Sequence, residues 1–104
     1  MSVIMTMWVK GDPEKLETFA AEKRDQIAAI AEAAKGHGCI AHRFYGHTEG
    51  GQMMVIDEWP DAESFNRFFE AEQERIGPVM EAAGVTMEPQ VDFWRKLETH
   101  DEIG

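Results

Sequence analysis

The 104-residue sequence predicts an α+β fold in which two helices lie on one face of a four-stranded antiparallel sheet. Short segments rich in β-branched and aromatic residues alternate with two longer segments whose apolar residues recur every three or four positions. The 43% hydrophobic content is typical of a folded protein, and the length is enough for one core. We therefore expect a single domain over residues 1–104, with a polar tail from about residue 99.

The first half of the chain predicts a strand followed by a long helix. Residues 3–9, VIMTMWV, have the composition of a strand. Asp12 and Pro13 form a helix start, because Asp caps free N–H groups and Pro has no N–H to satisfy. Apolar residues then recur at helical spacing as far as Ala34, and Gly36 ends the pattern. The spacing predicts one helix of about six turns.

The middle of the chain predicts a hairpin. Residues 39–47 and 52–59 read as strands, and the segment TEGG between them is a glycine-bearing loop. Pro60 ends the second strand, and Asp61 can cap the helix that follows. A stripe of phenylalanines marks the apolar face of that helix: Phe65, Phe68 and Phe69.

The last third predicts a short helical continuation and a final strand. The continuation is expected to kink at Gly77–Pro78, because Pro removes a helical hydrogen bond, and to end at Gly84. Residues 90–98 have strand composition. The complete order, β-α-β-β-α-β, is that of the ferredoxin-like unit when connections are right-handed and do not cross.

Both faces of the predicted sheet are apolar, which is unusual for a sheet covered by helices on one side only. In the first strand Met5 and Met7 point to one face, and Ile4 and Trp8 point to the other. A sheet with two apolar faces needs cover on both. We therefore expect a homodimer through the sheet face, the arrangement of a dimeric α+β barrel.

The hairpin loop fixes which side chains are neighbours. If TEGG is a four-residue loop, His42 pairs with Asp57 and Phe44 pairs with Val55, and all four lie on the face that also carries Trp59. A register shifted by one residue would place His42 and Asp57 on opposite faces.

A His–Asp pair inside an apolar wall is a candidate catalytic site. A carboxylate beside imidazole orients the ring and raises its basicity, which suits a general base. The alternative is a hydrogen-bonded core pair with a structural role only. The candidate catalytic residues are His42 and Asp57. The candidate substrate-binding residues are Phe44, Val55, Trp59, Phe65 and Phe68.

Composition argues against several other classes of function. The formal net charge of −10 lacks the basic footprint of a nucleic-acid-binding protein. No segment reaches the ~20 apolar residues of a membrane-spanning helix, and the first residues lack the basic segment of a secretion signal. We expect a cytoplasmic protein that binds neither nucleic acid nor membranes.

The histidines and the cysteine do not predict a metal site. His37, His42 and His47 recur every five residues, but an odd spacing points His42 and His47 to opposite faces of a strand. Zinc needs three or four ligands around one centre. Cys39 is the only cysteine, so no disulfide forms within the chain, and a small apolar core residue is its simplest interpretation.

Two segments, GHGCIAHRFY and IDEWPDAESFNRFF, resemble the antibiotic biosynthesis monooxygenase-like domains of the dimeric α+β barrel superfamily. The resemblance covers nearly the whole chain in element order. It implies a dimer in which each subunit holds a pocket between its sheet and its helices. It also implies oxidation of phenolic or quinol-type substrates by dioxygen with no cofactor, for which the protein supplies a base and an apolar cage. His42, Asp57 and Trp59 would fill those parts.

The chain departs from the polyketide-oxidising members of that family at two positions. Trp59 matches their strand-end Trp, but Val55 and Phe65 replace their Asn and Tyr. The haem-degrading branch has an Asn in its first strand, which this chain lacks. The predicted function is a cofactor-independent monooxygenase of small aromatic or quinol-type substrates. The alternative is a small-molecule-binding, isomerase-like or stress-response-like member of the same superfamily that is not an oxygenase.

Overall fold

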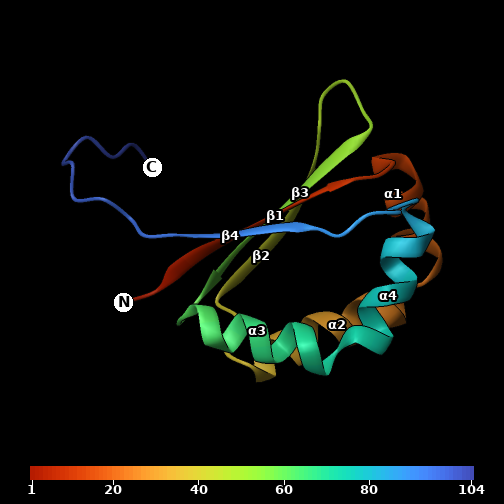
Figure 1. The fold of residues 1–104 in the computed structure, drawn as a ribbon, viewed down its shortest axis with the longest axis horizontal. Coiled ribbons are helices and arrows are strands. Elements are labelled where there is room, and N and C mark those ends of the chain that lie inside the picture. Colours follow the sequence, from red (N-terminus) through yellow and green to blue (C-terminus); the bar gives the residue numbers. More distant parts are fainter.

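The computed structural model describes all residues from 1 to 104. It contains four strands and four helices in the predicted overall order, with each expected helical segment divided in two (Figure 1). The elements are β1 (Val3–Lys10), α1 (Pro13–Glu22), α2 (Arg24–Gly36), β2 (Ala41–Gly46), β3 (Gln52–Trp59), α3 (Ala62–Ala71), α4 (Gln73–Ala82) and β4 (Gln90–Trp94).

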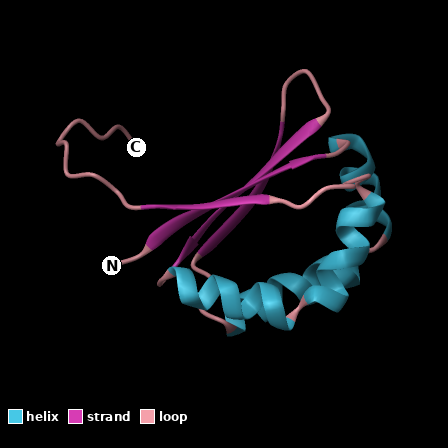
Figure 2. Ribbon diagram, viewed as in Figure 1, coloured by secondary structure: helices cyan, strands magenta, loops and turns pink.

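The four strands form one antiparallel sheet in the order β2-β3-β1-β4. All four helices lie on one side of it and form an arc, whereas the other face is uncovered (Figures 1 and 2). The predicted α+β, ferredoxin-like architecture is therefore confirmed. Within one chain the sheet is open, and it does not close into a barrel.

The first helical segment is not the single helix that the spacing predicted. It breaks at Lys23, whose backbone angles of φ −121° and ψ 49° are not helical. In Figure 1, α1 and α2 follow an arc around the twisted sheet. One straight helix of this length would move away from the sheet, and the break keeps both halves against it. The break lets Leu16 of α1 and Ala34 of α2 both reach the core.

The second helical segment bends earlier than expected. The break lies at Glu72, with φ −109° and ψ 21°, and α4 continues through Gly77 and Pro78. The break in this segment therefore lies at Glu72, before the Gly77–Pro78 step at which the sequence predicted a kink. Gly84 follows α4 with φ +76°, a conformation that favours glycine.

The last strand is shorter than predicted. It ends at Trp94, which pairs with Ile4 of β1, whereas the expected strand continued to residue 98. β1 begins at Val3, so the residues after Trp94 have almost no partner strand to pair with. The polar segment beyond residue 94 extends away from the helices (Figure 1).

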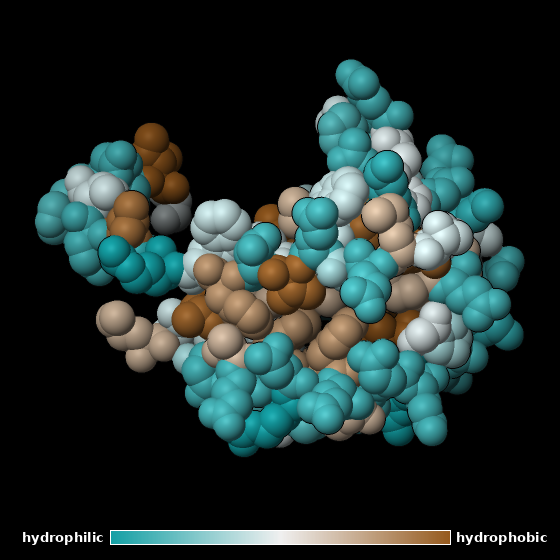
Figure 3. All heavy atoms as spheres, in the orientation of Figure 1, coloured by the Kyte–Doolittle hydropathy of each residue, from teal (hydrophilic) through white to brown (hydrophobic).

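The core lies between the sheet and the helices. It contains thirteen buried apolar residues, and Asp57 is the one buried charged residue. The buried apolar residues are Met5, Met7, Val9, Leu16, Ala34, Met53, Val55, Trp59, Phe65, Phe68, Ile76, Val79 and Ala83. Apolar residues gather between the two layers in Figure 3, and hydrophilic residues cover the outside of the helices. None of the helices combines the length and hydropathy needed to cross a bilayer.

Candidate functional site

The β2–β3 hairpin has the register that the four-residue loop predicted. His42 pairs with Asp57, and Phe44 pairs with Val55. The His47 N–H donates to the Gln52 carbonyl over 2.9 Å and closes the loop. His42, Phe44, Val55 and Asp57 therefore share the sheet face that carries the helices.

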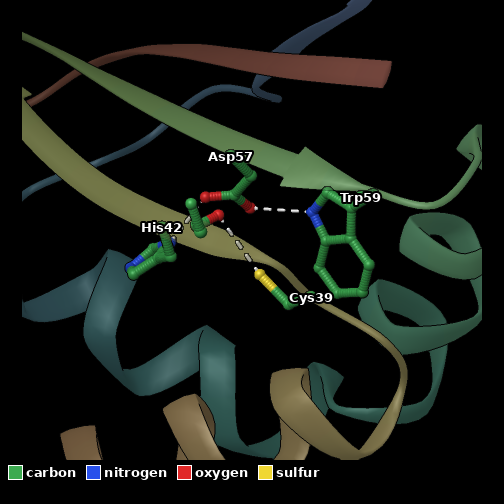
Figure 4. A network of polar contacts seen from close by, with 5 residues as sticks. Cys39, His42, Asp57 and Trp59 are labelled. Atoms are coloured by element: carbon green, nitrogen blue, oxygen red, sulfur yellow. Dashed lines mark hydrogen bonds and ion pairs between the residues drawn. The ribbon is translucent and has the colours of Figure 1, made fainter. Parts of the chain in front are cut away.

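Asp57 joins two rings through hydrogen bonds. Its Oδ1 lies 2.7 Å from Nδ1 of His42, and its Oδ2 accepts from the indole Nε1–H of Trp59 over 3.0 Å. Figure 4 shows the carboxylate between the two rings. The side chain of Asp57 is only 5% exposed. A buried carboxylate with a donor on each oxygen is a fixed acceptor rather than an unsatisfied charge.

These contacts determine which nitrogen of His42 is free. An ionised carboxylate can only accept, so Nδ1 of His42 carries the proton that faces Asp57. In the neutral ring Nε2 is then the unprotonated acceptor. The His42 side chain is 42% exposed, and its ring meets the edge of Phe44 at 5.1 Å between centroids. Nε2 can therefore serve as a general base for a ligand.

Trp59 has a different position from the one that sequence predicted for it. The side chain is completely buried and does not line the cavity described below. It packs against Phe65 and Phe68 of α3, with ring centroids 5.6 Å and 5.4 Å away. Trp59 thus lies behind Asp57 and supports it. The sequence did indicate the contact between Trp59 and Asp57, because residues two apart on a strand share a face.

An apolar cavity of about 330 Å³ lies between the sheet and the helices. This volume is at the lower end of the range for small-molecule sites. Of its twenty lining residues, seventeen are hydrophobic. The lining includes His42, Asp57 and four of the predicted substrate-binding residues: Phe44, Val55, Phe65 and Phe68.

The helices α2 and α4 supply a part of the lining that the sequence did not identify as a cavity wall. These side chains lie on the inward faces of the two helices. They are Ile27, Ile30, Ala31, Ala34, Lys35, Ile76, Val79 and Met80. Their helical spacing predicted an apolar face, but that spacing does not distinguish a cavity wall from a packed core.

Cys39 also lines the cavity, as an inert thiol. Its S–H donates to the Ala41 carbonyl over 3.3 Å (Figure 4). Burial, and then the negative charge of Asp57, raise the pKa of the Cys39 thiol to about 11. Because the thiolate is the nucleophilic form, Cys39 is not an activated cysteine at neutral pH.

The remaining histidines lie apart from one another. His37 packs edge-on against Phe68, and Nδ1 of His47 accepts from the Glu49 N–H. No three His, Cys, Asp or Glu side chains are grouped in a way that could hold a metal ion.

No family model matches the sequence, and no curated protein matches it significantly. Solved structures do match. A "putative antibiotic biosynthesis monooxygenase" from Deinococcus radiodurans is 16% identical, with a TM-score of 0.63 over 98% of this chain and 99% of that one. A protein of the same name from Bordetella bronchiseptica is 14% identical, with a TM-score of 0.65 over 92% and 97%.

A "conserved protein" from Methanosarcina mazei Go1 is 19% identical, with a TM-score of 0.65 over 93% of this chain and 94% of that one. The chain therefore has the antibiotic biosynthesis monooxygenase-like fold over nearly its whole length. Identities this low establish the shared fold, and chemistry has to be argued from the site itself.

Proposed function

We propose that this protein is a cofactor-independent monooxygenase that oxidises small aromatic or quinol-type substrates with dioxygen. One observation carries the proposal: His42 is fixed by Asp57 through a 2.7 Å hydrogen bond at the wall of an otherwise apolar cavity. The imidazole has a free acceptor and a buried anion behind it, which is the arrangement of a general base.

In the proposed reaction, the substrate supplies the electrons. Nε2 of His42 takes a proton from an acidic C–H or O–H of the substrate, and Asp57 stabilises the resulting imidazolium. In an anthrone-type substrate the carbanion gives its electron pair to dioxygen, and a C–O bond forms. The peroxide takes the proton back from His42. Loss of water then leaves a carbonyl, so one oxygen atom enters the substrate and the other leaves as water.

The apolar lining would keep water away from the reacting groups. Val55 and Phe65 are both buried, and together with Phe44 and Phe68 they surround the space beside His42. A cavity that excludes water strengthens the electrostatic contact between the imidazolium and the substrate anion. It also protects the peroxide from exchange with solvent.

The alternative function is that of a small-molecule-binding protein without oxygenase activity. The observation that favours it is the absence of a polar side chain at Val55 and Phe65, where the polyketide-oxidising proteins that the sequence resembles carry Asn and Tyr. A ligand in the cavity would then meet fewer proton donors and acceptors than in those proteins.

We also propose that the protein is a cytoplasmic homodimer. Large apolar side chains are exposed on the sheet face opposite the helices, among them Tyr45, Ile56 and Trp94. Covering them with a second copy would bury apolar surface and close the open sheet. Light scattering should give a mass roughly twice 11.8 kDa, and a monomeric mass would contradict this part of the proposal.

Oxygen uptake by the purified protein tests the proposed reaction. Hydroquinones, naphthols and anthrones are offered, and uptake is compared with the autoxidation blank. His42→Ala should lower the rate by about 10²–10⁴-fold with an unchanged circular dichroism spectrum. His47→Ala, which removes a histidine outside the cavity lining, is the matched control and should keep full activity. No uptake across the panel would reject the oxygenase and leave ligand binding.

A further inference from the structure

The polar groups of the cavity restrict what a ligand can offer to it. Three of the twenty lining residues are not hydrophobic: Lys35, His42 and Asp57. Both oxygens of Asp57 already accept hydrogen bonds, and the Cys39 thiol is engaged with a backbone carbonyl. The side-chain groups that remain for a ligand are therefore Nε2 of His42 and the ammonium of Lys35.

These two groups belong to side chains on the solvent-exposed part of the lining. The side chain of Lys35 is 71% exposed and that of His42 is 42% exposed, whereas the lining residues Met5, Val55 and Phe65 are buried. The exposed part of the lining also includes the apolar Ile40 and Phe44, so the two available polar groups lie beside an apolar rim. A ligand that fits this lining has an apolar body and carries its polar groups at its solvent-facing end.

Lys35 is free to interact with such a ligand. Its one ion-pair partner is Glu32, one turn earlier in α2, with 3.5 Å between Nζ and Oε1. Both side chains of this pair are largely exposed, and exposed pairs of this kind contribute little. A ligand anion can therefore replace or share Glu32 at small cost, and the flexible four-carbon stem of lysine allows the ammonium to follow it.

The charge of the whole chain makes a local cation important. The formal net charge is −10, and one of the carboxylates counted in it, that of Asp57, lies at the cavity wall. An anion is repelled by this surface within the screening length of about 8 Å at physiological salt. Among the lining residues Lys35 is the one with a formal positive charge, and it opposes this repulsion locally.

We propose that Lys35 determines specificity by selecting hydroxylated aromatic acids, whose ionised group stays at the mouth of the cavity while the ring enters it. This inference rests on the proposed function, because it assigns the substrate class of the same site. The hydroxyl of such a substrate faces His42, and its carboxylate is held by Lys35.

Calorimetric titration of the full-length protein with a charged ligand and its neutral analogue tests the inference. The probes are 1-naphthoate and 1-naphthamide, which have nearly the same shape and differ in charge. Lys35→Met should weaken binding of 1-naphthoate about fivefold to tenfold and leave that of 1-naphthamide unchanged. Lys35→Arg should retain the preference. Lys23→Met, which removes an exposed lysine outside the cavity lining, is the matched control.

The outcomes separate this inference from the proposed reaction. Loss of naphthoate binding alone supports the role of Lys35, whether or not oxygen is consumed. Equal effects of Lys35→Met on both ligands, or no effect on either, overturn it even if oxygen uptake with neutral naphthols is robust. Raising the NaCl concentration from 50 to 500 mM should weaken naphthoate binding to the wild-type protein only, and an equal loss for naphthamide would also count against an ion pair.

Discussion

The two faces of the sheet give similar residues different roles. Along β3, Asp57 and Trp59 point toward the helices, and the neighbouring Glu58 points to the open face. Asp57 is buried and accepts from two ring N–H groups, whereas the partly exposed Glu58 accepts from the hydroxyl of Ser2 over 2.5 Å. The helix layer, rather than the residue type, therefore turns an acid into a fixed acceptor inside a cavity.

Replacing the acid on each face should give the largest contrast. Asp57→Ala removes the acceptor of two buried or half-buried N–H groups, and we expect it to lower the free energy of unfolding by about 3 kcal/mol. Glu58→Ala removes the acceptor of a single hydroxyl, that of Ser2, and its cost should stay within about 1 kcal/mol.

Urea unfolding of both variants at one protein concentration measures this difference, because the stability of the proposed dimer would depend on concentration. Similar losses for Asp57→Ala and Glu58→Ala would mean that the covered face does not isolate its acid from solvent. The proposed role of the helix layer would then be wrong.

The indole donors of the two faces provide a second, smaller contrast. Trp59→Phe keeps most of the ring but leaves Oδ2 of Asp57 without its donor, which should cost about 1–3 kcal/mol. Trp94 donates to the Thr6 hydroxyl over 2.8 Å on the open face, where its side chain is 55% exposed. Trp94→Phe keeps the apolar ring that the proposed second copy would cover and gives up this one hydrogen bond, so it should cost about 1 kcal/mol or less.

The same urea measurement distinguishes the two tryptophan variants, and oxygen uptake adds a second readout. If Trp59 holds Asp57 against His42, Trp59→Phe should slow turnover, while the distant Trp94→Phe should not. Unchanged turnover in Trp59→Phe would show that His42 is held in place without the indole.

Sequence predicted the elements that depend on short-range rules. The loop length and the period of two gave the pairing of His42 with Asp57, and caps and glycines gave the ends of most elements. The breaks at Lys23 and Glu72 were not predicted, because they depend on the path of the helices around a twisted sheet. The local signal at Gly77–Pro78 did not indicate the break at Glu72.

The candidate site was predicted only in part, for a similar physical reason. Residues on the two hairpin strands could be assigned to one face by counting. The contributions of α2 and α4 depend on how helices dock, and spacing alone does not reveal an empty volume. For that reason Lys35 was missed, and Trp59 was expected in the cavity rather than behind Asp57.

The thiol on the covered face should make stability depend on alkaline pH. Because the pKa of Cys39 rises from 9.0 to about 11 on folding, the native state holds a proton that the unfolded state releases between these values. The contribution is complete below pH 9 and is lost as pH rises to about 11. The difference in unfolding free energy between wild type and Cys39→Ala should therefore shrink over this range.

A thiol reagent checks the same point independently at pH 8. Cys39 should react slowly in the native protein and rapidly in urea, because little thiolate forms in the folded state. Equal rates under both conditions would contradict a protected thiol on the covered face.

The smallest expected effect lies at the start of the helix that covers Trp59. The fully exposed Asp61 accepts from the Ser64 N–H over 2.7 Å, and this bond lowers the pKa of its carboxyl below the ordinary value of 3.8. This lowered pKa stabilises the fold at pH values above the pKa of Asp61 in the unfolded chain, and the contribution is lost as pH falls through the pKa in the folded state.

The variant Asp61→Asn tests this contribution, because it keeps a capping oxygen but cannot titrate. Below pH 4 the stability of this variant should fall less steeply than that of wild type in acid titrations followed by circular dichroism. Parallel acid curves would show that the cap of α3 does not link the covered face to pH.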